Sequence, residues 1–184
     1  HDDRVIAVVA RNTNLTGVRT SSRLELAYLQ AATELFQMIA SGAFPFKAQR
    51  SDLTDTPRVG DGFIQIDQRG EVTYASPNAQ SVFRRLGLAA DLTGESLAEV
   101  TRQLVPAQMR ADEEILSAVL FGRAPRAAEV GNAMATIIAR AVPLQPPGGS
   151  TGAVILVRDV TDLRRRDREL VTKDAAIREI HHRV

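Results

Sequence analysis

Two apolar, β-branched segments joined by a turn constrain the fold of this chain more than any other feature. The segments are "AMATIIARAVPL" (residues 133–144) and "GAVILVRDV" (residues 152–160), and the connection between them is "QPPGGS". Runs of this kind favour extended strands, and a connection rich in Pro and Gly reverses the chain. The two segments are therefore expected to be consecutive strands of an antiparallel sheet.

A second pair of strands is expected earlier in the chain. The stretch "GFIQIDQRGEVTYASPNA" contains two short runs of this type, residues 63–66 and 72–75, separated by the turn "DQRG". The second run is followed at once by Ser76 and Pro77. Ser is a favoured N-cap residue and Pro is favoured in the first helical turn, so a helix is expected to begin here.

Two further helical patterns lie between the two strand pairs. They are "SLAEVTRQLV" and "AQMRADEEILSAVLFG", and the second is expected to end at Gly122. The order along residues 60–162 is therefore strand, strand, helices, strand, strand. This order predicts an α+β domain, in which an antiparallel sheet has its helices inserted in the middle of the chain.

The first 42 residues follow a different pattern. "RVIAVVARNTN" predicts one strand at residues 5–10. "SSRLELAYLQAATELFQMIASG" predicts an amphipathic helix, and its expected apolar stripe is Leu24, Tyr28, Ala31, Leu35, Met38 and Ile39. Residues 43–59 carry Pro45 and Pro57 among polar residues, and they are expected to link residues 1–42 to the domain at residues 60–162.

The last segment, residues 163–184, is charged and carries a regular apolar repeat. Four apolar residues are spaced seven apart: Leu163, Leu170, Ile177 and Val184. A helix with this repeat cannot bury its stripe alone, so a parallel two-stranded coiled coil, and with it a homodimer, is expected. A single solvated helix is the alternative, because the companion core positions near Arg166 and Lys173 are polar.

The composition excludes several classes of function. The formal net charge is only +1, from 23 basic and 22 acidic residues, so no direct binding to nucleic acid or to an anionic membrane is expected. The absence of Cys excludes a disulfide framework, a thiolate metal site and a nucleophilic thiol. No apolar run approaches the roughly 20 residues that span a bilayer, and a cytoplasmic protein is expected.

The segment from residue 62 to residue 162 resembles a PAS domain. "GFIQIDQRGEVTYASPNA" is similar to the opening hairpin and helix start of that family, and "GAVILVRDVTDL" is similar to its final strand and Asp-Xaa-Thr exit. The resemblance implies a sensor domain that relays a signal through Asp159, Thr161 and Asp162. Thr161 is expected to cap the outgoing helix, while Asp159 holds the strand end against it.

The final residues, "EIHHRV", resemble the phosphoacceptor box of the HWE/HisKA_2-like subfamily of sensor histidine kinases. In that box the phosphorylated residue directly precedes Arg-Val, which implies His182 as the acceptor and leaves His181 as a weaker alternative. The layout of the family implies that residues 1–42 are the end of a GAF-like domain. It also implies a response regulator as partner, of an RNA-binding antitermination type.

The resemblance places ATP binding in a kinase domain beyond this sequence. Neither the family's Lys-Asn-Asn continuation nor a glycine-rich phosphate loop is found in the chain, so it is not expected to be active alone. A different output, such as a cyclic dinucleotide synthase controlled by a dimerisation or small-ligand-binding module, is the alternative. The residues after Val184 distinguish the two, because Lys-Asn-Asn-Leu indicates the kinase and Gly-Gly-Asp-Glu-Phe the synthase.

Phosphorylation of His182 requires a neutral and exposed imidazole. A solvated histidine has a pKa of about 6.5 and is largely neutral at cell pH. If the apolar repeat faces inward, His182 lies on the outer side of the helix, whereas His181 flanks the interface. Adjacent helical residues point about 100° apart, so the two histidines are not expected to chelate one metal ion.

No cofactor is expected within this chain. It has no Cys to form a flavin adduct and no His between residues 2 and 180 to ligate haem. Five residues are candidates to line a small-molecule cavity: Tyr74, Phe83, Met109, Phe121 and Met134. Apolar residues at such positions more often belong to a packed core, so a domain that relays a signal without a ligand is the favoured interpretation.

Overall fold

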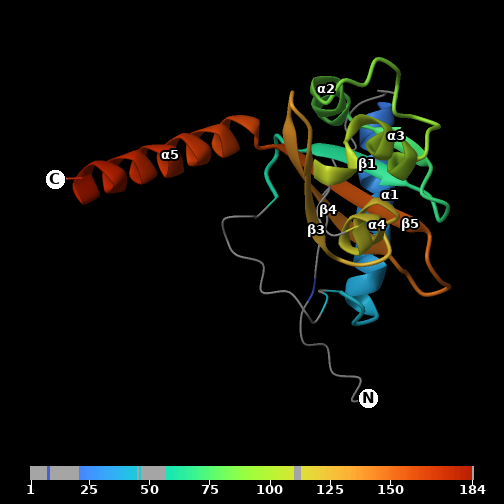
Figure 1. Ribbon diagram of the computed structural model, residues 1–184. Helices are drawn as coiled ribbons and strands as arrows, with labels where there is room; N and C mark the ends of the chain where they lie inside the picture. Colours follow the sequence, from blue (N-terminus) through green and yellow to red (C-terminus); the bar gives the residue numbers. More distant parts are fainter. Residues whose placement is uncertain (1–7, 9–20, 45, 47–56, 110–112, 184) are drawn as a thin grey trace.

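A five-stranded antiparallel sheet forms the centre of the molecule (Figure 1). The computed structural model describes residues 8, 21–44, 46, 57–109 and 113–183, with the backbone alone from residue 174 onward. The strands are β1 (Gly62–Ile66), β2 (Val72–Ala75), β3 (Ala127–Gly131), β4 (Thr136–Leu144) and β5 (Gly152–Asp159). Their order is β2-β1-β5-β4-β3, which confirms the α+β class with helices inserted between strand pairs.

The hairpin of β4 and β5 has the predicted antiparallel pairing. Its register runs from Ile137 opposite Asp159 to Leu144 opposite Gly152. Gly152 has a φ of +129°, and a Cβ atom there would lie 2.0 Å from the carbonyl oxygen of Ile66. Only glycine fits this position. On its other side β5 pairs with β1, from Ala153 opposite Ile66 to Val157 opposite Gly62. Strand β5 is therefore the centre of the sheet.

Strand β3 was not predicted from the sequence. Its residues, "AAEVG", include two Ala, a Glu and a Gly, all of which have low intrinsic preference for strands. The segment is extended because it pairs with β4, from Ala127 opposite Arg140 to Gly131 opposite Thr136. Pairing with the neighbouring strand β4, 5 to 13 residues further along the chain, rather than intrinsic strand preference, makes it the edge strand.

One face of the sheet is covered by α2 (Pro77–Arg85), α3 (Leu97–Leu104) and α4 (Glu113–Leu120). The predicted cap at Ser76 is confirmed, since its hydroxyl accepts hydrogen bonds from the amides of Ala79 and Phe63. The predicted helix over residues 107–122 is described as a 3-10 turn, η2 (Ala107–Met109), and α4. Gly122 ends α4 with a φ of +59° and lies against Ala153.

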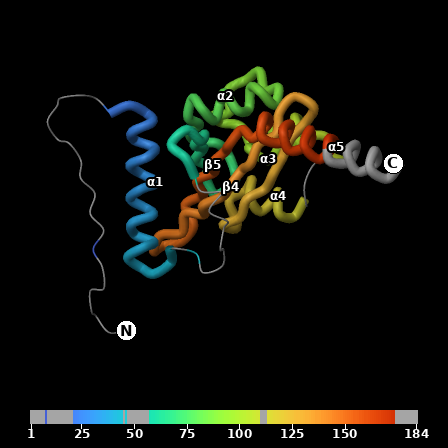
Figure 2. Tube along the Cα trace, turned by 90° about the vertical axis from the view of Figure 1, so that its left-hand side faces the viewer, coloured from blue at the N-terminus to red at the C-terminus, as the bar shows by residue number. Residues whose placement is uncertain are grey.

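The opposite face is covered by α1 (Arg23–Ala40). In Figure 2, β4 and β5 lie between α1 on one side and α2, α3 and α4 on the other. Its buried residues pack with three residues of the sheet; the cluster is Ala27, Ala31, Met38, Phe63, Leu144 and Val154. Of the expected stripe, Tyr28 is 44% exposed but packs its ring 4.5 Å from that of Phe63, whereas Leu24 and Ile39 are 36% and 37% exposed and lie outside the buried cluster. The small side chains of Ala27 and Ala31 let the helix approach the sheet closely, so the face of α1 that carries them is turned toward the sheet.

Helix α5 (Thr161–Arg183) continues directly from β5 and extends away from the sheet and its helices (Figure 1). Three apolar side chains on its described part are exposed: Leu163 (54%), Leu170 (60%) and Val171 (70%). The predicted strand at residues 5–10 lies outside the described residues, apart from Val8.

Helix α1 is expected to contribute to the stability of the whole domain. Met38 is fully buried, so Met38→Ala is predicted to lower the free energy of unfolding by about 2–4 kcal/mol. Leu26 is 55% exposed on the same helix, and Leu26→Ala is predicted to change it by less than about 0.5 kcal/mol. Urea unfolding of both variants measures the difference. Equal effects would show that α1 is not docked in solution.

Candidate functional site at the base of the C-terminal helix

The junction of β5 and α5 is held by a small hydrogen-bond network around Asp159. One carboxylate oxygen of Asp159 accepts from the amide of Thr161 at 2.8 Å and from its hydroxyl at 2.5 Å. The Thr161 hydroxyl in turn accepts from the amide of Thr136, at the start of β4, at 3.0 Å. The first residue of α5 is thereby tied to two strands.

The second carboxylate oxygen of Asp159 accepts a hydrogen bond from Arg85, in the last turn of α2, at 2.6 Å. Burial by itself would raise the pKa of Asp159, but the hydrogen bonds from Thr161 and Arg85 outweigh it and hold the pKa below its ordinary value of 3.8. Asp159 is therefore anionic at neutral pH and links α2, β5 and α5.

The predicted roles at this junction are partly reversed. Thr161 does not cap α5 with its side chain, because its hydroxyl is directed to Asp159 and β4. Asp159 satisfies the first amide of the helix instead. Asp162 stays outside the network, and its exposed carboxylate pairs with Arg165 one turn along the helix at 3.1 Å. Within the described residues, the structure thus joins Asp159 and Thr161 but not Asp162.

A second anchor fixes the first turn of α5 to the edge of the sheet. Arg164 binds both carboxylate oxygens of Glu129 on β3, at 2.5 to 3.0 Å. Hydrogen bonds to Glu129 raise the pKa of Arg164 further above its ordinary value. Bidentate geometry of this kind fixes orientation as well as distance. Neither residue was identified from the sequence, since Glu129 lies on the unpredicted strand.

A third ion pair ties the start of the domain to its end. Arg158 donates to both carboxylate oxygens of Asp61 at 2.7 and 2.8 Å, and the Asp61 side chain is only 8% exposed. Burial alone would raise the pKa of Asp61, but Arg158 and the amide of Arg58 lower it. Since Asp61 directly precedes β1, the segment that enters the sheet is bound to the strand from which α5 leaves.

The two histidines lie on α5, and their side chains are outside the described part of the chain. His182 follows Thr161 by 21 residues on the same helix. At about 1.5 Å of rise per residue, this places its backbone about 30 Å from the base of the helix. The backbone therefore connects the network at Asp159 to His182 by one continuous helix.

The five candidate cavity residues do not lie around one cavity. Phe83 is buried in the core on the face of the sheet under α2, α3 and α4, whereas Tyr74 packs near α1 on the opposite face. Met109 and Met134 are 50% and 61% exposed and line separate surface grooves beside α5. Phe121 borders a hollow between α3 and α4. The sequence could not separate these positions, because all five are simply large and apolar.

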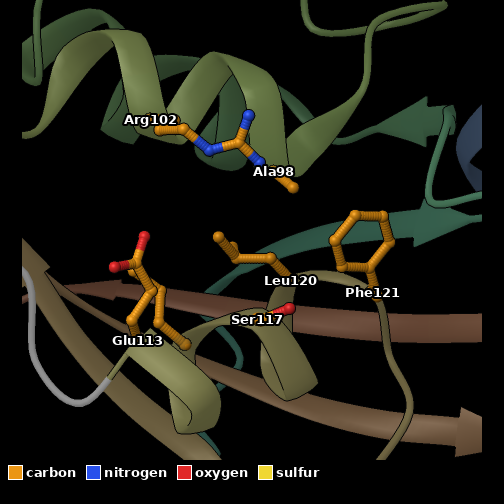
Figure 3. A pocket seen from close by; sticks show the side chains of 7 residues that line it. Ala98, Arg102, Glu113, Ser117, Leu120 and Phe121 are labelled. Atoms are coloured by element: carbon orange, nitrogen blue, oxygen red, sulfur yellow. The ribbon is translucent and has the colours of Figure 1, made fainter.

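The hollow between α3 and α4 is narrow (Figure 3). Ala98 and Arg102 of α3 face Glu113, Ser117 and Leu120 of α4 across it. Its volume is about 40 Å³, enough for a few water molecules and too small for a flavin or a haem. In the described part of the chain, no three acidic or His side chains are grouped to hold a metal ion, and no helix is apolar and long enough to cross a bilayer.

Comparison with known proteins gives a consistent set of relatives. The model of the PAS fold family matches residues 57–165. The sensor histidine kinase PdtaS of Mycolicibacterium smegmatis is 44% identical over 186 aligned positions, and that of Mycobacterium tuberculosis is also 44% identical. The alignments cover 99% to 100% of this chain but only 37% of those proteins, so the chain spans little more than a third of their length.

A solved structure agrees with these relatives. It is described as the sensor region of a sensor histidine kinase, and it matches with a TM-score of 0.69 at 38% identity. The match covers 82% of this chain and 58% of the other.

The network at Asp159 is expected to stabilise the domain in a pH-dependent way. Asp159→Ala is predicted to lower the free energy of unfolding by about 1–3 kcal/mol at pH 7, because it removes charge-assisted hydrogen bonds to a mostly buried carboxylate. Asp162→Ala removes only a surface pair and is predicted to change it by less than about 0.5 kcal/mol. Urea unfolding of both variants tests this contrast.

The pH dependence gives an independent check. The pKa of Asp159 is lower in the folded chain than in the unfolded chain, so its contribution is present above the unfolded pKa and is lost as pH falls through the folded pKa. The difference between wild type and Asp159→Ala should therefore shrink below about pH 4. A difference that stays constant down to pH 2 would contradict the network's role.

Proposed function

The chain belongs to the PAS fold family, and from this premise we propose that it is the sensor region of a two-component histidine kinase. The observation that carries the proposal is the 44% identity to PdtaS sensor kinases along the entire chain, which includes the C-terminal helix as well as the domain. The role of the chain would be to control autophosphorylation by ATP at His182 and transfer of the phosphoryl group to a response regulator.

The chemistry of the proposed acceptor needs no special environment. A solvated imidazole is largely neutral near pH 7, and a neutral nitrogen can attack the γ-phosphate of ATP. The stricter requirement is access. A coiled coil with Leu163 and Leu170 in its seam would leave the outer faces of both helices open to a kinase domain. The exposure of these two leucines, 54% and 60%, supports a partner helix that covers them.

Signal relay is proposed to act through the base of α5. Relay requires two arrangements of the junction that differ in how they present His182. The discrete contacts of Asp159 with Arg85 and of Arg164 with Glu129 are suited to this, because an ion pair is either made or broken. Upstream, residues 1–42 are proposed to end a GAF-like domain, with α1 as the helix shared between that domain and the PAS sheet. Its packing on Phe63 and Val154 supports such a link.

The proposal has consequences for partners and location. The partner would be a response regulator, proposed to be an RNA-binding antitermination type, and ATP would bind a kinase domain that follows this chain in the parent protein. Such a kinase works in the cytoplasm, where ATP and the regulator are available.

The identity of the phosphoacceptor can be tested in the parent kinase. His182→Gln is expected to abolish labelling by γ-labelled ATP, because it removes the nucleophile. His181→Gln is the matched control and is expected to keep at least about half of the labelling, since it changes a neighbour on the same helix without removing the acceptor. The labelled phosphate should be acid-labile and stable to base.

Each outcome decides one part of the proposal. Label that persists in His182→Gln and disappears in His181→Gln would move the acceptor to His181. Absence of label in the wild-type parent, in the presence of ATP and Mg²⁺, would reject the histidine kinase itself.

The dimer is tested separately with this chain. Leu170→Asp is expected to raise the dimer dissociation constant at least about tenfold in sedimentation equilibrium, because a charge in the seam lacks a partner. Val171 is even more exposed than Leu170, at 70% against 60%, but stands outside the seven-residue repeat, so Val171→Asp should have little effect. Equal effects of the two substitutions, or a wild-type chain that is monomeric at high concentration, would contradict the coiled coil.

A further inference from the structure

A buried glutamine beneath the N-terminal half of α1 has a side-chain amide without a hydrogen-bond partner among the described residues. Gln65 is in β1, on the face of the sheet that α1 covers, and it is only 8% exposed. Within the described residues, its backbone carbonyl accepts from Thr73, but its side-chain amide makes no hydrogen bond. A buried amide without a partner costs stability, so such a side chain usually serves a bound molecule or an ordered water.

The amide of Gln65 is directed toward a groove rather than sealed in the core. No fully enclosed side-chain nitrogen or oxygen lacks a partner in the described part of the chain, so the Gln65 amide must retain contact with open space. It lines a groove of about 600 Å³ between α1, β2 and the start of α2. This groove is on the opposite face of the sheet from the core packed under α2, α3 and α4.

The polar groups around the groove have a definite arrangement of charge. Arg23, at the start of α1, and Asp91, in the loop after α2, both line it, so it carries one positive and one negative side chain. Hydrogen bonds from Thr93 hold the pKa of Asp91 below its ordinary value, and the carboxylate is anionic at neutral pH. Gln30 and Gln80 also line the groove, but the amide of Gln30 donates to Glu34, and that of Gln80 is bound to the backbone of Ala90 and Leu92.

Part of the groove wall is an edge of the sheet. Strand β2 is the edge strand, and its outer hydrogen bonds are made near Val72, to Gly94 and Glu95 of the following loop. Thr73, Tyr74 and Ala75 lie beside the groove instead. A strand edge offers backbone donors and acceptors to an extended peptide group, and the Tyr74 ring adds an apolar surface.

We propose that this groove binds a small zwitterion with a central amide, of the dipeptide class. The carboxylate of the ligand binds Arg23, its ammonium group binds Asp91, and its peptide group exchanges hydrogen bonds with the Gln65 amide. The net charge of such a ligand is zero, which matches one cation and one anion at the groove. A primary amide both donates and accepts, and so does a peptide group, which makes Gln65 a better match to a dipeptide than to a simple anion.

The position of the groove gives the ligand a mechanical effect. Its walls come from α1 on one side and from β2 and α2 on the other, so a bound molecule bridges the helix and the edge of the sheet. Binding would therefore favour the docked position of α1. This inference concerns binding alone and does not depend on the kinase proposal.

The test is a titration of the ¹⁵N-labelled chain with Ala-Ala, followed by NMR through the side-chain amide signals. Saturable shifts of the Gln65 amide signals are expected. N-acetyl-Ala-Ala, which lacks the ammonium group, and Ala-Ala amide, which lacks the carboxylate, are each expected to bind at least about tenfold more weakly. Free alanine, which lacks the peptide group, is expected to bind at least about tenfold more weakly as well.

Two variants and a control separate recognition from folding. Gln65→Leu and Asp91→Asn are each expected to reduce the affinity for Ala-Ala about tenfold. The melting temperature of unliganded Gln65→Leu should equal or exceed that of wild type, because an unpartnered buried amide is replaced by an apolar group. Gln103→Leu changes an exposed glutamine of α3, outside the groove, and should leave the affinity unchanged.

Three results would overturn the inference. They are the absence of saturable shifts at Gln65 up to millimolar Ala-Ala, undiminished affinity in Gln65→Leu and Asp91→Asn, and equal affinity for free alanine. The first would indicate that water alone satisfies the amide. The inference is supported if the wild type and Gln103→Leu bind Ala-Ala while Gln65→Leu and Asp91→Asn bind it more weakly. This result is independent of whether the parent protein is a kinase.

Discussion

Strand β5 pairs with β1 on one side and with β4 on the other, and the rest of the structure depends on this double pairing. It brings the start of the domain next to its end, although about 100 residues separate them. Successive side chains of a strand point to opposite faces, so Arg158 reaches Asp61 on one face while Asp159 reaches Arg85 on the other. The point from which α5 leaves is thereby fixed from both sides of the sheet.

The central strands are apolar on both faces, and this explains the place of α1. All five residues of β1 and most of β5 are buried, which is possible only if helices cover each face. Helices α2, α3 and α4 cover one face, and α1 covers the other with Ala27, Ala31 and Met38. Gln65 is the polar exception under α1, and the groove beside it is where this second layer is incomplete.

The proposed groove and the proposed output lie toward opposite edges of the sheet. The groove borders β2 at one edge, whereas Arg164 anchors α5 to β3 at the other. Strands β1, β5 and β4 connect them, and β5 carries Asp159 at its end. A change in the position of α1 would act on Phe63 of β1 and Val154 of β5, and β5 ends at Asp159, at the base of α5. This physical route would connect a ligand to the helix that bears His182.

The sequence by itself determined the features that depend on near neighbours. The turn "QPPGGS" and the runs beside it determine the β4 and β5 hairpin, Ser76 and Pro77 determine the start of α2, and Asp159 with Thr161 marks the junction with α5. Tertiary structure alone decided β3, which is a strand only because β4 pairs with it, and the face of α1 that is buried. It also decided the partners of Asp159 and Glu129, and it separated the five apolar residues that composition could not distinguish. Local preferences act over a few residues, whereas the ion pairs of Glu129 with Arg164 and of Asp159 with Arg85 join positions 35 and 74 residues apart, and only the folded sheet brings them together.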